Sequence, residues 1–369
     1  MDRIVISGYY GFNNIGDESI LTAIVGNLKE YIKDVEITVL SANPEATSKK
    51  HQIQSVDRKN IYEICRAIKK CDLFISGGGS LLQDVTSGRS ISYYLAIILI
   101  ALLLRKKVLI YSQGMGPINK WFNKCMVRWV LNRVDCITIR DEKSKKVLDE
   151  VGVSIQKTYV TTDPVISLHQ GNRSLGKEIL KKEGISYQRP LIGFAIRGRD
   201  DNEEFVSNIS MIADQIIKDF KVDVVFIPFH FGEDVKIMDK IENKMEQKAF
   251  FIQNRYNIDE MLGIVGNLSL LIGVRLHSLI FSAIMNVPLV AISYDPKIDS
   301  FMESLDLKAL CSIENLNYKD LYEEINYIQN NYGQVQNILQ KRVQKLQDKL
   351  KKNEKVVKEL LKGGNSFEK

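Results

Sequence analysis

Short apolar segments rich in β-branched residues alternate along this chain with longer segments whose apolar residues recur at helical spacing. The second half of the chain repeats the order of the first. Strands that alternate with helices in this way predict parallel sheets with helices on both faces. The expected strands are residues 3–7, 35–40, 72–76, 108–112, 136–140 and 158–162, and then 191–196, 223–228, 268–272 and 287–292.

The length of 369 residues suits two domains of ordinary size. A polar, glycine-containing segment, residues 169–176, separates the two repeats of the pattern, and we place the domain boundary there. The chain is therefore predicted to be an α/β protein with domains at residues 1–170 and 171–369. The composition, 45% apolar and 26% charged, is that of a soluble globular protein.

The last segment, residues 334–361, has the pattern of one long amphipathic helix with lysines opposite its apolar stripe. Residues 341–369 hold ten Lys and Arg against four Asp and Glu, which accounts for the whole net charge of +6. The body of the chain is therefore neutral, and nucleic acid is not an expected partner. Two interpretations of the helix stay open: packing on a domain with a solvated basic face, or attraction to anionic lipid.

Residues 93–104 are an unbroken apolar run closed by Arg105, Lys106 and Lys107. The run is too short for a membrane span, which needs about 20 residues, so we expect a helix buried against a sheet. A patch that leans on a membrane is the alternative. Five cysteines without a Cys-x-x-Cys pair and four scattered histidines predict no disulfide framework and no metal site. With no visible signal peptide, these features indicate a cytoplasmic protein.

Two loops of the first half carry candidate ligand groups. The loop after the first expected strand, residues 8–18, contains three glycines together with Asn14 and Asp17, and it is longer than an ordinary βα turn. Its spacing is not Gly-x-Gly-x-x-Gly. The second loop begins with the glycines at 77–79 and continues through Gln83 and Asp84, whose side chains could bind sugar hydroxyls. A tight turn that packing requires is the alternative for this second loop.

The central feature of the second half is the segment Gly273-Val274-Arg275-Leu276-His277-Ser278 between a predicted strand and a predicted helix. A helix start favours anions, and ligands of open α/β sheets bind at the carboxyl ends of strands. Arg197 and His230 also follow predicted strands of this half, so these groups are expected at one sheet edge. Two arginines predict a ligand with two anionic groups, and His277 could transfer a proton near neutral pH. The alternative is an arginine paired with a carboxylate and a histidine in a core hydrogen bond.

Four motifs together resemble the polysaccharide pyruvyltransferase family, and within it the bacterial cell-wall pyruvyltransferases. They are Gly11-Phe12-Asn13-Asn14-Ile15-Gly16-Asp17-Glu18, Gly77-Gly78-Gly79, Gln113-Gly114-Met115-Gly116-Pro117 and Gly273-Val274-Arg275-Leu276-His277. The resemblance implies two Rossmann-like, doubly wound domains in a GT-B-like arrangement with the active site in the cleft. It implies phosphoenolpyruvate as donor, an N-acetylmannosamine residue of a lipid-linked cell-wall precursor as acceptor, and a 4,6-linked pyruvate ketal as product.

The resemblance also implies that the Arg-Leu-His turn and an earlier arginine after a strand bind the donor, and the other roles are hypotheses from residue type and loop position. Arg275, Leu276 and His277 would bind the donor on the second domain, with Arg197 or Arg199 as a further ligand and His230 beside them. His277 would be the general acid. The first domain would be the acceptor side, through Asn14, Asp17, Gly78, Gly79, Gln83 and Asp84. The general base stays open among Asp17, Asp84 and Asp200, and neither a metal nor a cofactor is required.

Two other functions remain possible at this point: a GT-B glycosyltransferase that uses a nucleotide sugar, and a non-enzymatic two-lobed sugar-binding protein. The second class is usually exported and gives no role to a histidine at an arginine-flanked helix start. An enzyme acting on a lipid-linked glycan would work at the inner face of the cell membrane. The oligomeric state is not predicted.

Overall fold

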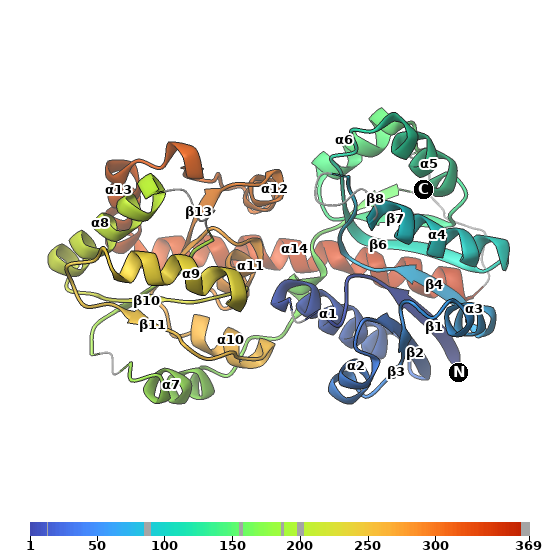
Figure 1. Ribbon diagram of the computed structural model, residues 1–369, viewed down its shortest axis with the longest axis horizontal. Coiled ribbons are helices and arrows are strands. Elements are labelled where there is room, and N and C mark those ends of the chain that lie inside the picture. The colour runs from blue at the N-terminus through green and yellow to red at the C-terminus, as the bar shows by residue number, and fades with distance from the viewer. Residues whose placement is uncertain (13, 85–89, 155–157, 186–187, 198–202, 363–369) are drawn as a thin grey trace. The chain divides into compact units, whose positions relative to one another are not determined.

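The computed structural model describes residues 1–369 except 13, 85–89, 155–157, 186–187, 198–202 and 363–369, and Figure 1 shows its helices and strands. The chain forms two compact units. Unit 1 comprises Met1–Leu168 and Leu346–Lys369, and unit 2 comprises His169–Lys345. The division after residue 168 falls beside the expected boundary, but the end of the chain, which we had assigned to the second domain, groups with unit 1.

Unit 1 is a parallel sheet with helices on both faces (Figure 1). Its strands run in the order β3-β2-β1-β4-β6-β7-β8, and β5 pairs with β6. In chain order the elements are β1 (Asp2–Ser7), α1 (Ile15–Tyr31), β2 (Val35–Ser41), α2 (Pro44–His51), β3 (Gln54–Asp57), α3 (Ile61–Lys70), β4 (Leu73–Ser76), β5 (Gly79–Leu82), α4 (Ser90–Leu103), β6 (Lys107–Met115), α5 (Trp121–Leu131), β7 (Cys136–Ile139), α6 (Glu142–Val151), β8 (Thr158–Val160) and the 3-10 helix η2 (Pro164–Ser167).

Unit 2 repeats this architecture with the strand order β11-β10-β9-β12-β13-β14, and its strand pairs are also parallel. Its elements are α7 (Arg173–Lys182), β9 (Leu191–Ala195), α8 (Glu203–Phe220), β10 (Asp223–Phe226), α9 (Phe231–Glu242), β11 (Phe250–Phe251), α10 (Ile258–Val265), β12 (Leu270–Gly273), α11 (Leu276–Ile284), β13 (Leu289–Ser293), α12 (Pro296–Ser304), β14 (Cys311–Ser312), the 3-10 helix η3 (Ile313–Asn315), α13 (Tyr318–Asn330) and α14 (Tyr332–Leu361). The predicted parallel α/β class is confirmed in both units.

The strand order fixes where each unit can bind a ligand. In unit 1 the chain winds outward from β1 through β2 to β3, and in the other direction from β4. In unit 2 the same reversal lies between β9 and β12. Ligands of such sheets bind beside this switch point, at the carboxyl ends of the strands.

Residues 93–103 of the apolar run lie in α4, as predicted, and Leu104 follows the end of this helix. One face of α4 is buried against the unit 1 core through Ile91, Tyr94, Leu95, Ile97, Ile98 and Ala101. The other face is partly exposed and ends at Leu103, which is an exposed residue. Among the described residues, no helix is both long enough and apolar enough to cross a membrane.

The predicted long C-terminal helix is α14, and its apolar stripe is covered by protein. Leu339, Leu346, Leu350, Val357 and Leu360 are buried, whereas Ile338, next to Leu339, is exposed. The first part of α14 belongs to unit 2 and the part from Leu346 to unit 1. Packing is therefore the interpretation that the structure supports for this helix.

Candidate active site

The strand-to-helix turn at Arg275 has the predicted form. β12 ends at Gly273, Arg275 occupies the N-cap position in an extended conformation, and α11 begins at Leu276. The side chain of Arg275 makes no capping hydrogen bond, so its guanidinium is turned to other partners. The first backbone N–H groups of a helix lack intrahelical acceptors, and this start faces the carboxyl edge of the sheet.

The structure brings the predicted second-half residues to one sheet edge. Arg197 follows β9 and Arg275 follows β12, the two neighbouring strands that flank the switch point of unit 2. His230 follows β10, on the other side of β9, and is the N-cap residue of α9. His277 is the second residue of α11 and is partly exposed. The side chain of Leu276 is buried, which leaves its backbone N–H as the group that a ligand could contact.

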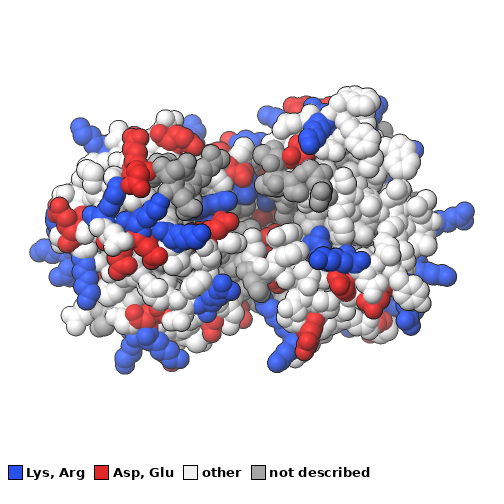
Figure 2. Space-filling model, viewed as in Figure 1, with Lys and Arg blue, Asp and Glu red and all other residues white. Residues whose placement is uncertain are grey.

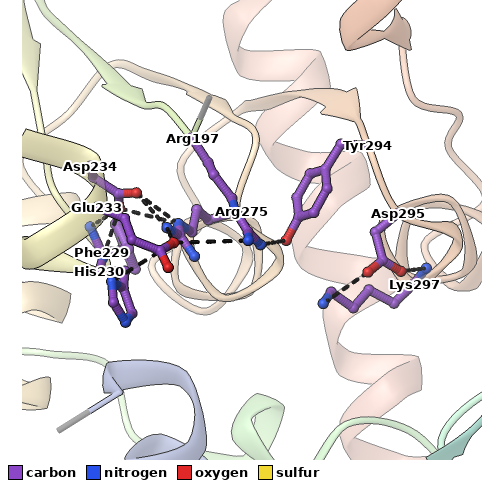
Figure 3. A network of polar contacts seen from close by, with 9 residues as sticks. All are labelled: Arg197, Phe229, His230, Glu233, Asp234, Arg275, Tyr294, Asp295 and Lys297. Carbon is purple, nitrogen blue, oxygen red and sulfur yellow. Dashed lines mark hydrogen bonds and ion pairs between the residues drawn. The ribbon is translucent and has the colours of Figure 1, made fainter. Parts of the chain in front are cut away.

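Arg275 is held by a buried carboxylate. Its Nε lies 3.1 Å from both carboxylate oxygens of Asp234, and its Nη2 also contacts Oδ1 (Figure 3). The side chain of Asp234 is 1% exposed and that of Arg275 is 14% exposed. Asp234 also accepts hydrogen bonds from the backbone N–H groups of Phe229 and His230 at 3.0 and 2.7 Å. This carboxylate therefore fixes both the arginine and the loop before α9.

One carboxylate oxygen lies among three groups that can carry positive charge. Oε2 of Glu233 is 3.1 Å from Nη2 of Arg275, 3.8 Å from Nη2 of Arg197 and 3.9 Å from Nδ1 of His230 (Figure 3). The Glu233 side chain is 54% exposed, so it reaches this point from the surface. Its oxygen marks a position at which an anionic ligand group would meet both arginines.

Tyr294 holds the second arginine. Nη1 of Arg197 donates a hydrogen bond of 2.7 Å to the Tyr294 hydroxyl, and the guanidinium lies 4.8 Å from the centre of the Tyr294 ring. Tyr294 follows β13, the next strand along the sheet. A further cation, Lys297, lies beside it and pairs with Asp295 at 3.1 Å (Figure 3).

The charges of this site stabilise one another. Burial alone would raise the pKa of the Glu233 carboxyl. A hydrogen bond from Arg275 and the nearby cations outweigh burial, so the pKa lies below its ordinary value. Burial lowers the pKa of Arg197, whereas Tyr294 and the neighbouring carboxylates raise it above its ordinary value overall. Both groups are therefore ionised at neutral pH.

Sequence reasoning did not select Glu233, Asp234 or Tyr294 as site residues. The sequence does contain a signal for the two carboxylates. Glu233 and Asp234 lie near the start of a predicted helix, at the sheet edge expected for the two arginines. A partly buried arginine needs a negative partner, and these residues could supply it.

In unit 1 the residues of the first glycine loop lie at the switch point between β1 and β4. Asn14 is the N-cap of α1 and accepts a hydrogen bond from the backbone of Gly16 at 3.0 Å. Asp17 lies in the first turn of α1, where its Oδ1 is 3.5 Å from the position of a Cβ built on Gly79. The structure thus brings Asn14, Asp17, Gly78 and Gly79 to neighbouring strand ends.

Packing accounts for the three consecutive glycines. A Cβ on Gly77 would lie 2.2 Å from the hydroxyl of Tyr10, and one on Gly78 would lie 2.9 Å from Ile20. Gly79 has a φ of +94°, which favours glycine. The alternative of a turn required by packing is therefore sufficient for these residues, and their acceptor role stays a prediction.

Asp84 has a structural task. Its carboxylate accepts hydrogen bonds from the backbone N–H groups of Asn119 and Lys120 at 2.8–3.0 Å and from the side chain of Asn123 at 3.0 Å. Burial raises the pKa of Asp84, but these hydrogen bonds lower it below its ordinary value overall. Asp84 therefore fixes the loop that enters α5, and a carboxylate engaged in this way is a poor general base. Gln83, its neighbour, is partly buried.

A buried charged cluster that we did not predict lies at the ends of β7 and β8. Nη1 of Arg140 is 3.5 Å from Oδ2 of Asp163, and Nη2 donates to the hydroxyl of Ser80 at 3.1 Å. Both charged side chains are less than a tenth exposed.

Three positions of the sequence prediction, Asn13, Arg199 and Asp200, lie outside the described residues. Within the described part of the chain, no group of three or more His, Cys, Asp or Glu residues could hold a metal ion.

Comparison with known families adds a finding that covers most of the chain. A family model described as polysaccharide pyruvyl transferase matches residues 14–296, which include Arg197, His230, Arg275 and His277. The chain is also similar to the amylovoran biosynthesis protein AmsJ of Erwinia amylovora. The two are 21% identical over 90% of this chain and 94% of AmsJ.

Solved structures with the same fold include sugar-nucleotide enzymes. HepE of Anabaena in complex with UDP-glucose aligns with a TM-score of 0.67 at 12% identity, over 98% of this chain and 100% of HepE. A glycosyltransferase of Rickettsia africae aligns with a TM-score of 0.67 at 15% identity, over 99% of each chain. MnaA of S. aureus, solved with UDP, aligns with a TM-score of 0.64 at 12% identity, over 92% of this chain and 91% of MnaA. These likenesses establish the fold, and the predicted pair of Rossmann-like units of GT-B type is confirmed.

Proposed function

Because the chain belongs to the polysaccharide pyruvyl transferase family, and is thus a transferase with a polysaccharide substrate, we propose that it moves pyruvate from phosphoenolpyruvate to a cell-wall glycan. The acceptor we propose is an N-acetylmannosamine residue of a lipid-linked precursor, as in the bacterial cell-wall members of the family, and the product is a 4,6-ketal. Such an enzyme would work in the cytoplasm, at the inner face of the cell membrane.

The observation that carries the donor assignment is the position of the Glu233 carboxylate among Arg275, Arg197 and His230. Phosphoenolpyruvate has a carboxylate and a phosphate ester attached to the same carbon of one small molecule. Two guanidinium groups at the start of neighbouring loops match two such anions. In this proposal one anionic group of the donor takes the place of the Glu233 carboxylate.

The proposed chemistry needs one proton donor near the donor's methylene carbon, and we assign it to His277. Protonation of that carbon gives a methyl group and places positive charge on the adjacent carbon, to which a sugar hydroxyl adds. The phosphate then leaves with the bonding electrons, and a second hydroxyl closes the ketal. Of the two hydroxyl protons released, one restores the acid and the other leaves with phosphate.

Arg197 and Arg275 would stabilise the negative charge that gathers on the leaving phosphate. Asp234 would act as a positioning residue for Arg275, because it holds the guanidinium on the side away from the surface. The general base remains open. Asp17 is the described candidate whose carboxylate faces a predicted acceptor loop.

The direct test is release of inorganic phosphate from phosphoenolpyruvate with and without a soluble N-acetylmannosamine-containing acceptor. We expect release that depends on acceptor, and an acceptor product whose mass increases by that of pyruvic acid minus water. UDP-sugars serve as the competing donors. Release of UDP with no requirement for phosphoenolpyruvate would replace the proposal by a nucleotide-sugar transferase.

Two variants locate the chemistry. Replacing Arg197 by Gln should abolish turnover, whereas Arg189→Gln should not, because Arg189 is exposed near the opposite end of β9. Replacing His277 by Ala should lower kcat by about 10²–10⁴ while phosphoenolpyruvate still binds, as expected for a general acid. A His277→Ala enzyme with nearly full kcat would exclude this histidine from the acid role.

A further inference from the structure

An exposed apolar surface on α4 and α5 has no role in the proposed reaction. Its largest side chains are Leu103, Trp121, Phe122 and Trp129, which are 73%, 77%, 63% and 49% exposed. The two helices contact each other, and Figure 2 shows a face with little charge over them. We call these four residues the α4–α5 face.

Within the segment of the chain that carries it, this face has a basic border. Residues 85–134 contain eight Lys and Arg and no Asp or Glu. Arg105, Lys120, Lys124 and Arg128 are exposed beside the four apolar side chains. Arg133 lies 4.2 Å from the ring centre of Trp129 and donates to its backbone carbonyl. A large apolar surface whose own segment carries only basic charges has the composition of a surface for anionic lipid.

A second copy of the chain is a poor occupant for the same face. In a symmetric dimer the same patch meets itself, which would bring two basic borders together without acidic partners from this segment. The other segment we considered for lipid contact, α14, buries most of its apolar stripe within the protein and exposes Ile338 as a large apolar residue.

We propose that the α4–α5 face docks the protein on an anionic lipid bilayer, with the aromatic side chains in the interfacial region and the basic border on the headgroups. The inference adds a contact surface to the proposed function and does not depend on the donor. Both tryptophans of the chain, Trp121 and Trp129, lie on this face. Intrinsic tryptophan fluorescence therefore reports this surface alone.

The test uses the full chain and vesicles of phosphatidylcholine with or without phosphatidylglycerol. We expect co-sedimentation and a blue-shifted tryptophan emission with the anionic vesicles, both reduced by high salt. Replacing Phe122 by Ala together with Leu103 by Ala should weaken binding by about tenfold or more, because both side chains would be buried in lipid. The matched control replaces Met211 and Tyr327, which are 56% and 53% exposed on unit 2, and it should bind as the unchanged chain does.

A second pair of variants separates this face from the basic C-terminal helix. Replacing Lys120 and Lys124 by Gln should weaken binding, whereas replacing Lys341 and Lys345 on α14 should not. Binding that only the α14 pair weakens, or binding without a change in tryptophan emission, would overturn the inference. Absence of vesicle binding would also overturn it, as would concentration-dependent dimers in which the tryptophans are protected.

The two proposals can fail separately. Phosphate release with a soluble acceptor needs no membrane. Activity without vesicle binding would therefore refute only the docking proposal. Vesicle binding by a chain that releases no phosphate would refute only the proposed reaction. The Phe122 and Leu103 variant should keep its activity on the soluble acceptor, which also shows that it folds.

Discussion

Replacing Glu233 by glutamine should tighten the binding of phosphoenolpyruvate. In the structure the Glu233 carboxylate occupies the position between Arg275, Arg197 and His230 that we assign to an anionic group of the donor. A donor that binds there must displace it and break its contacts. Glutamine keeps the shape of the side chain but removes the charge, so the internal competitor becomes weaker.

The expected magnitude follows from the geometry and the exposure. The contact with Arg275 is a short ion pair of 3.1 Å, those with Arg197 and His230 are longer, and the Glu233 side chain is 54% exposed. Exposed ion pairs contribute about 0.2–1 kcal/mol each, so we take about 1 kcal/mol for the group. That free energy corresponds to a Kd about fivefold lower.

Calorimetric titration with phosphoenolpyruvate at low ionic strength measures this Kd directly. The matched control is Glu203→Gln, which removes another acidic residue at a helix start of unit 2, one paired with Lys244 at 2.9 Å and not with the site arginines. The control should leave Kd unchanged. An equal or higher Kd for Glu233→Gln would refute the reasoning, because it would mean that the carboxylate does not hold the donor's place.

Three further predictions test other parts of the structure by chemical denaturation. Gly77→Ala should lower stability by about 1–3 kcal/mol, because its Cβ would lie 2.2 Å from a buried tyrosine hydroxyl, whereas Gly26→Ala, in α1 with nothing within 4 Å, should raise it by about 0.5–1 kcal/mol. Equal effects would contradict this. Burial and nearby lysines lower the pKa of His51 from 6.5 to about 4, so the folded state binds fewer protons than the unfolded one and stability should fall by roughly 3 kcal/mol as pH drops from 6.5 to 4. His51→Gln should reduce that loss, and an unchanged pH profile would exclude His51 as its source. Asp234→Asn should lower stability by about 3–5 kcal/mol and weaken donor binding, because it leaves the charge of Arg275 partly buried without its main partner. A variant as stable as the original would show that the pair is not required.

The sequence was sufficient for the fold class and for the sheet edge that carries the candidate site. Alternating periodicity fixes strand and helix, and parallel strands bring their carboxyl ends together, so Arg197, His230 and Arg275 could be placed at one edge without coordinates. The shortest strands could not be predicted in this way. β11 and β14 have two residues each, and so short a segment carries no periodicity.

The partners of the site residues needed the structure. Asp234 and Arg275 are 41 positions apart, and no local pattern pairs them. The three glycines at 77–79 suggested ligand contact, but their neighbours Tyr10 and Ile20 are packing partners from another segment. The stripe of α14 left packing and lipid contact both open, and a stripe carries no information about which unit covers each part of it.

The division of α14 between the units has a consequence for biosynthesis. Unit 1 includes residues from Leu346 onward, and among them Asn353 is fully buried and donates a hydrogen bond of 2.8 Å to Ser112 of the sheet. When a ribosome has released the first 168 residues, this helix does not yet exist. The N-terminal unit must therefore wait, with part of its apolar core uncovered, until nearly the whole chain has been made. Domains usually fold in the order of their synthesis, but here the unit that is synthesised first would complete its folding last. A nascent chain that stalls before Leu346 would expose apolar core surface, which chaperones bind.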